Sequence, residues 1–373
     1  HTRFRNVTGV QTCALPISGI QLSNTNFACS KSEYNFENAV LEEKINTSDD
    51  ADMLQSFAQW NFRATEKLTF NAGLHYTGFY MNQTQSLEPR ASVTYLLPAM
   101  QSVSIGYGLH SQTQPLGVYF VDDTTSNVTE GINRHLDLSK SHHLVLSYEV
   151  MINAHHHLKA EGYFQKLYNI PVGSEPGSTF SIINHSDGFT TETLHNSGYG
   201  RNYGIELTFE RYLYKQFYYL LTVSLFDSKY QADDHIWRNT KYNGHFASTF
   251  TGGKEFAIGK PGKNRTLGLN LKVIYRGGYY QTPVDVDQSV AEGYPVYDDA
   301  NAFTEKMPDY FRTDIKVSLK RNRIKSTQTI ALDIQNVTNR KNVYGNYYNI
   351  DSQKLETYYQ APLIPILSYK IEF

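Results

Sequence analysis

The feature that most constrains the fold is a two-residue alternation of apolar and polar side chains, which continues to the last residue. The final segment, 364–373, places Tyr369, Ile371 and Phe373 on one face and only polar side chains between them. Successive side chains of a β-strand point to opposite faces, so this segment has one apolar and one polar face. The chain is therefore expected to consist of strands that separate two different environments.

The same alternation recurs in about fourteen segments, and a helical period is not sustained anywhere. Several segments reach about ten residues, which is the length that a tilted membrane-spanning strand needs. The expected strands are 19–29, 54–62, 68–76, 91–97, 103–109, 144–150, 158–164, 203–209, 221–225, 244–258, 267–275, 311–320, 330–335 and 364–373.

The composition excludes membrane-spanning helices but fits a membrane-spanning sheet. Mean hydropathy is −0.48, and no stretch of 18 apolar residues exists. A barrel needs an apolar side chain only at every second position, so low hydropathy does not argue against it. The 29 Tyr residues favour the same class, because Tyr suits a membrane–water interface. The net charge of −2 implies no nucleic acid or other polyanionic partner.

The expected connections alternate between short and long. Short turns are expected at 65–67, 98–101, 153–156, 214–216, 260–264 and 322–326. Long loops are expected at 30–53, 112–141, 169–199, 231–243, 281–309 and 339–363, with a shorter one at 82–87. Short turns on one rim and long loops on the other are typical of an outer-membrane barrel. An even number of strands also places the C-terminus on the rim with the short turns.

Charges decide which face is wet. In segment 311–320, Arg312, Asp314 and Lys316 share one face. Charged side chains are costly in hydrocarbon, so this face is expected to point into a lumen. The opposite face carries Ile315, Val317 and Leu319, and it is expected to face lipid.

Residues 1–18 differ from the rest of the chain. Segment 7–18, VTGVQTCALPIS, resembles the in-frame translation of a sequencing-library adaptor. The expected domains are therefore a non-native segment, 1–18, and a partial barrel, 19–373, whose natural sequence starts further upstream. Its first and last strands are not expected to share a full ladder. If Cys13 is foreign, Cys29 is the only native thiol, and no disulfide framework is present.

Four stretches together carry a family resemblance. They are SLEPRASVTYLLP (Ser86–Pro98), GYGRNYGIELTFER (Gly198–Arg211), DIQNVTNRKNVY (Asp333–Tyr344) and the closing LSYKIEF. In their order and spacing, the chain resembles the C-terminal barrel of a TonB-dependent outer-membrane receptor of the Bacteroidetes type. The resemblance implies an antiparallel barrel of 22 strands around a plug domain in the Gram-negative outer membrane. About fourteen of these strands are expected in this chain, and the plug is expected in the part that is missing.

The resemblance also implies partners. The TonB complex would act through the missing N-terminal part. The barrel-assembly machinery would recognise the terminal strand with Phe373, Tyr369 and Ile371, and outer-membrane lipid would surround the sheet. The implied function is active uptake of a scarce nutrient such as a siderophore, cobalamin, oligosaccharide or peptide. Two other functions stay open, which are a passive diffusion channel of the porin kind and a barrel enzyme.

Neither a catalytic site nor a cofactor motif is predicted. His155–His157 lie in a short turn, where three adjacent side chains cannot all converge on one metal ion. Acidic pairs in the long loops, such as Asp122–Asp123 and Asp298–Asp299, offer oxygen ligands for calcium, but solvated loop charge is the better explanation of them, and no metal site is predicted.

The candidate ligand-binding residues are aromatic. The faces of aromatic rings bind sugars, aromatic chelates and peptides. Tyr294, Tyr297 and Tyr347 lie far from any strand end, and Trp237 lies in a long loop, so these four are the predicted ligand contacts. Tyr279 and Tyr280 lie next to a strand end and are instead predicted to belong to the aromatic girdle at the membrane interface.

Overall fold

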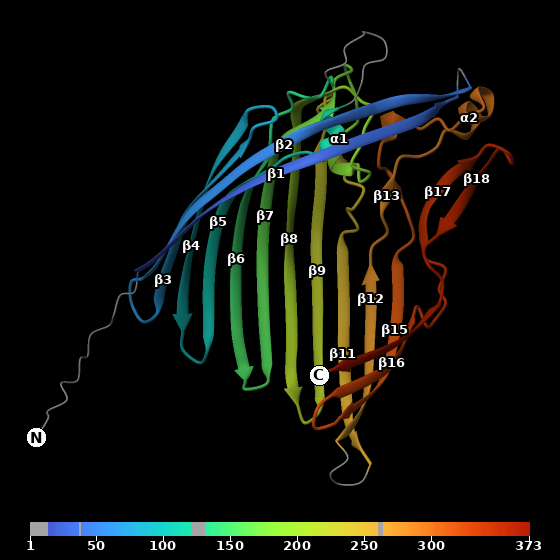
Figure 1. Ribbon diagram of the computed structural model, residues 1–373. Coiled ribbons are helices and arrows are strands. Elements are labelled where there is room, and N and C mark those ends of the chain that lie inside the picture. The colour runs from blue at the N-terminus through green and yellow to red at the C-terminus, as the bar shows by residue number, and fades with distance from the viewer. Residues whose placement is uncertain (1–13, 37–38, 121–130, 260–263) are drawn as a thin grey trace, which may run out of the picture.

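A computed structural model describes residues 14–36, 39–120, 131–259 and 264–373. Its centre is an antiparallel sheet of 15 strands, and 14 of them follow one another in sequence order around the sheet (Figure 1). These are β1 (Ala14–Asn35), β2 (Val40–Arg63), β3 (Leu68–Phe79), β4 (Thr84–Leu97), β5 (Gln101–Gln112), β6 (Ser139–Asn153), β7 (His156–Gly173), β8 (Leu194–Tyr214), β9 (Phe217–Gln231), β11 (Phe246–Ile258), β12 (Arg265–Arg276), β15 (Tyr310–Asn322), β16 (Thr327–Gln335) and β19 (Ile364–Glu372). The predicted meander of about fourteen strands is confirmed.

The remaining elements lie in the long connections. The strand β10 (Trp237–Asn239) pairs with β9, and two small sheets pair β13 (Tyr280–Gln281) with β14 (Glu305–Lys306) and β17 (Val343–Asn349) with β18 (Lys354–Tyr359). The helical segments are α1 (Leu116–Tyr119), η1 (Ile182–Asn184), α2 (Val286–Glu292) and η2 (Asp299–Asn301). Among the described residues, no helix is long and apolar enough to cross a membrane.

The register keeps like side chains together on each face. Lys316 of β15 is paired with Asn270 of β12 and Asp333 of β16, so polar residues adjoin polar residues. Val317 is paired with Leu269 and with Leu332 of the same two strands. A shift of one residue would exchange the two faces, so this agreement across strands fixes the register. The alternation predicted for 311–320 is therefore present in the sheet.

The two rims of the sheet differ as predicted. At one rim, β2 ends at Arg63 and β3 begins at Leu68, and the connections of β4–β5, β6–β7, β8–β9 and β15–β16 are equally brief. At the other rim lie the long connections 113–138, 174–193, 232–245, 277–309 and 336–363. Glu372 is paired with Thr327, which follows a short turn, so the chain ends at the rim with the short turns. The strands β1 and β19 form the two ends of the sheet and are not paired with each other.

The first hairpin corrects two predictions. The expected loop 30–53 is wrong, because β1 and β2 stay paired along this stretch as far as Asn35 and Val40. Ile45 and Ala51 of this stretch pack against the long connections rather than lipid, and contacts such as Asn24 Nδ2 to Asp52 Oδ1 at 2.6 Å join the polar side chains of the two strands. The expected start near Gly19 is also wrong, since β1 begins at Ala14 and its first five residues pair with β2. The rest of the predicted adaptor segment, residues 7–13, lies outside the described residues.

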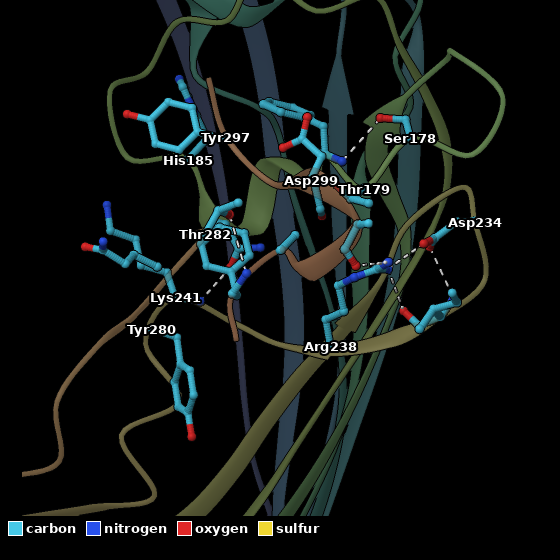
Figure 2. A pocket seen from close by; sticks show the side chains of 18 of the residues that line it. Ser178, Thr179, His185, Asp234, Arg238, Lys241, Tyr280, Thr282, Tyr297 and Asp299 are labelled. Carbon is cyan, nitrogen blue, oxygen red and sulfur yellow. Dashed lines mark hydrogen bonds and ion pairs between the residues drawn. The ribbon is translucent and has the colours of Figure 1, made fainter. Parts of the chain in front are cut away.

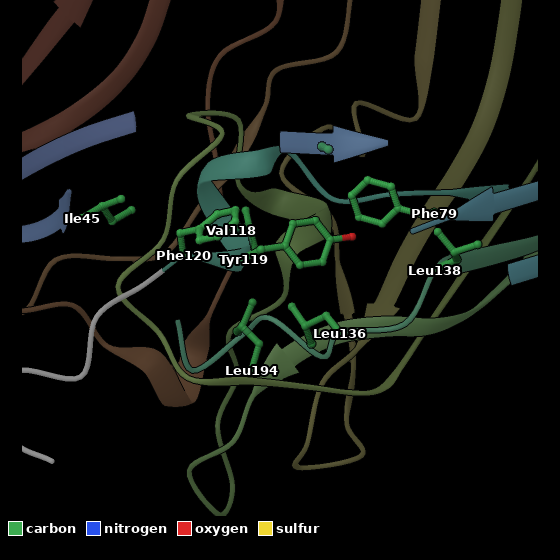
Figure 3. Packing of buried hydrophobic residues seen from close by; sticks show 9 residues of the cluster. Ile45, Phe79, Val118, Tyr119, Phe120, Leu136, Leu138 and Leu194 are labelled. Atoms are coloured by element: carbon green, nitrogen blue, oxygen red, sulfur yellow. The ribbon is translucent and has the colours of Figure 1, made fainter. Parts of the chain in front are cut away.

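A buried cluster packs among the long connections beneath this hairpin (Figure 3). Tyr119 of α1 is fully buried, and its ring lies 5.7 Å from the ring of Phe79. The backbone N–H of Gln114 donates to the Tyr119 hydroxyl at 3.0 Å, and burial raises the pKa of Tyr119 to about 12. The cluster consists of Ile45, Ala51, Phe79, Val118, Tyr119, Phe120, Leu136, Leu138 and Leu194. It attaches the first hairpin to the connections 113–138 and 174–193. Part of the rim with the long connections is therefore held in place by apolar packing.

Candidate ligand site at the mouth of the barrel

An open cavity of about 1110 Å³ lies among four long connections, at the rim of the sheet that carries the long connections. Connections 174–193, 232–245 and 277–309 supply most of its wall, and the β17–β18 hairpin supplies the rest. We call it the mouth cavity (Figure 2). Ligand-binding pockets commonly measure about 300–1,000 Å³, so this volume accommodates a bulky small molecule.

Hydrogen bonds of the Lys241 backbone join three of the connections. Its N–H donates to Asn184 Oδ1 at 2.8 Å, and its carbonyl accepts from the N–H of Tyr280 at 2.9 Å. Lys241 therefore links 174–193, 232–245 and 277–309 without using its side chain. The bond to Tyr280 joins backbone to backbone and is independent of side chains, whereas the bond to Asn184 depends on its side-chain carbonyl.

The hairpin is attached through a second set of bonds. Asn346 donates from its N–H to Gln281 Oε1 at 2.9 Å and from Nδ2 to Glu305 Oε1 at 3.0 Å. Gln281 also donates to Glu305 at 3.0 Å, so the three residues form a closed triangle of hydrogen bonds. A Cβ atom at the neighbouring Gly345 would lie 2.9 Å from Gln281 Oε1. Glycine at 345 therefore allows this close approach.

A buried ion pair occupies the wall near β10. Arg238 Nη1 lies 2.5 Å from Asp234 Oδ2, and Figure 2 shows the two side chains meeting there. Their side chains are only 9% and 12% exposed. Because Asp234 neutralises Arg238, this guanidinium is not available as a free charge for an anionic ligand.

Two carboxylates face the cavity without such a partner. No hydrogen bond or ion pair to the carboxylate of Glu192 or Asp299 is found within the described part of the chain. Both carboxylates are open to solvent in the cavity. Partial burial raises the pKa of Glu192, and the negative charges of Asp299 and Glu175 raise it further. Partial burial also raises the pKa of Asp299, and the negative charge of Asp298 adds to this increase. The cavity thus has an acidic side that favours neutral or cationic groups.

Unused hydrogen-bonding atoms line the same cavity. Ser181 and Asn184 are 3% and 8% exposed, yet Ser181 Oγ and Asn184 Nδ2 have no partner within the described ranges. His185 Nε2 is likewise buried and unpaired. A buried polar atom without a partner costs free energy, so these atoms indicate a place where a ligand or water completes the bonding.

The structure separates the four predicted aromatic contacts. Only Tyr297 lines the mouth cavity. Tyr294 stacks on Phe36 at the tip of the first hairpin, with ring centroids 5.8 Å apart. Tyr347 donates its hydroxyl to Glu356 within the β17–β18 hairpin at 3.0 Å. Trp237 covers the guanidinium of Arg201, 4.6 Å from its ring centroid.

Other cavity residues were missed by the sequence analysis. Tyr279 and Tyr280 were assigned to the girdle, but both lie in the cavity wall. Phe180 and Glu192 were not singled out for ligand contact, and Asp299 was considered only as an oxygen ligand for calcium. In the sequence, these residues are marked only by their position in long connections. Which of these connections come together depends on the curvature of the sheet, which the sequence pattern does not give.

The histidine run and the acidic pairs do not converge on a metal. Within the described ranges, no group of three or more His, Cys, Asp or Glu side chains is arranged to hold a metal ion. His155 instead stacks on Tyr214, with centroids 3.7 Å apart, and Asp298 accepts from the N–H of Asn301 at 3.3 Å. Asp122–Asp123 lies outside the described residues.

Comparison with known proteins identifies relatives of this sheet. Residues 17–337 match the family model described as TonB dependent receptor-like, beta-barrel. No curated protein matches the sequence.

Solved structures share the fold at low sequence identity. They include the ferric-catecholate import receptor Fiu of E. coli K12 (TM-score 0.62, 11% identity, 95% of this chain and 51% of that chain). The ferric yersiniabactin uptake receptor FyuA of Yersinia pestis gives a TM-score of 0.62 at 12% identity, over 97% of this chain and 51% of that chain. FpvA of P. aeruginosa gives a TM-score of 0.64 at 11% identity, over 97% and 46%. The chain thus spans about half the length of these structures.

Proposed function

The chain belongs to the TonB-dependent receptor β-barrel family, and from this membership we propose that it serves active uptake of a scarce, bulky nutrient. Receptors of this family lie in the outer membrane of Gram-negative bacteria, where the apolar face of the sheet meets lipid. We propose that the nutrient is captured in the mouth cavity and that the TonB complex of the inner membrane supplies the energy. No covalent chemistry is needed for this role.

The observation that carries the proposal is the mouth cavity itself. It lies at the rim with the long connections, and it combines aromatic faces with unpaired polar atoms. Tyr280 and Tyr297 supply the faces, and Ser181 and Asn184 supply the unpaired atoms. This is the combination by which small-molecule sites bury an apolar surface and orient polar groups.

The charges of the cavity narrow the class of nutrient. The guanidinium of Arg238 is neutralised by Asp234, and among the remaining ionisable residues of the wall the acids Glu175, Glu192 and Asp299 outnumber the bases His185 and Lys241. We therefore propose a neutral or cationic nutrient, such as a sugar or a peptide with amino groups, rather than an anionic iron chelate. The relatives with solved structures include receptors for ferric chelates, and a shared fold does not carry over their ligands.

The test of uptake uses cells that produce the complete receptor. Candidate oligosaccharides and peptides are supplied as the limiting nutrient, with and without a functional TonB complex. We expect one class to support growth only when both the receptor and TonB are present. Growth that needs the receptor but not TonB would indicate a passive channel instead.

The test of the cavity uses the ligand found in this way. Tyr297→Ala is expected to weaken binding by up to roughly tenfold, because an aromatic contact is worth about 0.5–1.5 kcal/mol. Tyr347→Ala is the matched control, since this ring contacts its own hairpin. Equal loss in both variants would place the ligand outside the mouth cavity.

A further inference from the structure

Four basic residues form one row across four neighbouring strands. His142 of β6 is paired with Lys166 of β7, Lys166 with Arg201 of β8, and Arg201 with Lys229 of β9. Side chains at directly opposed positions have Cβ atoms about 4.5–5.5 Å apart, and like charges so placed destabilise a sheet. The row therefore costs stability unless an anion compensates it.

The row lies on the apolar face of the sheet. Strand alternation puts Lys166 on the same face as Phe164, and Arg201 on the same face as Tyr203 and Ile205, all of which are exposed. The strands run on from the row toward the long connections, and the apolar side chains lie on its other side, toward the short turns. The row consequently marks the edge of the lipid-facing band at the rim that carries the mouth cavity.

Acidic partners are lacking along this row. Of the residues the structure describes, none forms an ion pair with Lys166, Arg201 or Lys229. Arg201 Nε is buried and has no hydrogen-bond acceptor. The nearest acid on this face, Asp227, accepts from Asn243 Nδ2 at 2.9 Å and lies 3.8 Å from His245 Nδ1. The positive charge of the row is thus left for another molecule.

Aromatic rings flank the row. Trp237 lies over the guanidinium of Arg201, which places this ring beside the row rather than in the mouth cavity. His142 lies between Tyr107, whose hydroxyl is 2.9 Å from its Nδ1, and the stacked ring of Tyr168. Aromatic rings favour the level where acyl chains meet headgroups. Lys140, two residues from His142 on the same face, adds a fifth basic residue.

We propose that this row binds the phosphate groups of a phosphorylated glycolipid in the outer leaflet of the membrane. Lys166, Arg201 and Lys229 would bind phosphate, and Trp237, on the side of the row away from the apolar band, would hold the guanidinium of Arg201 in place. The position on the lipid-facing surface favours a lipid over a soluble phosphate. Basic residues at the membrane surface attract anionic headgroups in this way.

The experiment measures lipid binding to the purified complete receptor by native mass spectrometry. The probes are bis-phosphorylated lipid A, the same lipid after dephosphorylation, and inorganic pyrophosphate. The variants are Lys166→Gln, Lys166→Gln with Arg201→Gln, and Lys316→Gln as a control that removes one charge from the opposite face. A heat-modifiability gel confirms that each variant folds.

We expect lipid A to bind and its dephosphorylated form to bind at least about tenfold more weakly. The double variant should lose a similar factor, the single variant less, and Lys316→Gln none. Equal binding of both lipids, or unchanged binding to the double variant, would overturn the proposal. Displacement of lipid A by millimolar pyrophosphate alone would assign the row to soluble phosphate and would also overturn it. A misfolded double variant leaves the single variant and the lipid comparison to decide.

Discussion

The guanidinium of Arg238 and the carboxylate of Asp234 meet at 2.5 Å in the wall of the mouth cavity, four residues apart and nearly buried. Arg238 Nη2 also approaches the carbonyl of Ala300 at 3.5 Å, which belongs to another connection. The pair thus positions two connections relative to each other. Its role is structural, which leaves the unpaired carboxylates Glu192 and Asp299 as the proposed charged contacts of the ligand.

The first prediction concerns this pair. Arg238→Gln leaves Asp234 without its partner, which should cost the folded connections about 1–3 kcal/mol. Amide hydrogen exchange should accelerate in 232–245 and 277–309, while exchange in the strands stays unchanged. Lys215→Gln, in the short turn between β8 and β9 at the opposite rim, is the control. Unchanged exchange in both connections would show that the pair does not hold them.

The second prediction concerns pH. Because the pKa of Glu192 and of Asp299 is raised in the folded chain, folding favours their protonated forms. Stability from these groups is therefore fully present below their ordinary pKa of about 4 and is lost as pH rises through the raised values. Asp299→Asn should slow hydrogen exchange in 277–309 at pH 7 and have no effect at pH 3.

The same titration affects the ligand. A cationic nutrient should bind more tightly as pH rises and the two carboxylates ionise, and the double variant Glu192→Gln with Asp299→Asn should abolish this dependence. A neutral sugar should show little dependence in either protein. Tighter binding of an anionic ligand at high pH would contradict the proposed acidic side.

The strands could be predicted from the sequence because their signal is local. Each strand of the 54–373 region shows its two faces within about ten residues, and pairing of neighbours in sequence order then follows from short turns. The failure at 30–53 has the same origin. Asp49, Asp50 and Asp52 interrupt the apolar alternation on β2, where Ile45 and Ala51 are buried against the long connections instead of facing lipid.

The mouth cavity could not be predicted in this way. Tyr297 and Tyr347 look alike in sequence, since both are aromatic and distant from strand ends. They differ only in what lies across from them: Tyr347 meets Glu356 of its own hairpin, whereas Tyr297 faces connections more than 50 residues away. Such long-range contacts depend on the curvature of the whole sheet. The contact of Trp237 could not be predicted for the same reason, because its partner Arg201 lies on another strand, β8.

The third prediction concerns Gly345. In Gly345→Val the new side chain would displace Gln281 from the triangle with Asn346 and Glu305. The β17–β18 hairpin should then detach, and trypsin should cleave it at Lys354 several times faster. Gly162→Val is the control, because a Cβ atom at Gly162 meets nothing within 4 Å. Equal cleavage in the two variants would mean that the triangle does not attach the hairpin.

The fourth prediction concerns Glu88, a buried charge on the polar face that is 2% exposed. It contacts Arg90 at 2.9 Å, His75 at 3.2 Å and Thr77 at 3.2 Å, and it also accepts from Ser111. Glu88→Ala leaves these donors unpaired and should lower the free energy of unfolding by about 2–4 kcal/mol. Thermal denaturation in detergent measures this, with the exposed Glu66→Ala as the control. A midpoint equal to the control would show that water replaces the carboxylate.

The last prediction concerns Phe373. Its side chain is 98% exposed at the rim with the short turns, and the adjoining strand β19 pairs only with β16 within the described residues. Tyr369 and Ile371 precede it on the same alternating face, and both are exposed. An aromatic ring in this position contributes no packing to the described sheet, so its removal should leave the strands intact. The family resemblance implies instead that the assembly machinery recognises this end.

Removing Phe373 from the complete receptor should therefore lower its amount in the outer membrane severalfold, whereas the protein that does insert should keep normal heat modifiability. Lys370→Gln, on the other face of β19, is the control. If the truncated receptor reaches the membrane at the level of the control, recognition lies elsewhere in the strand.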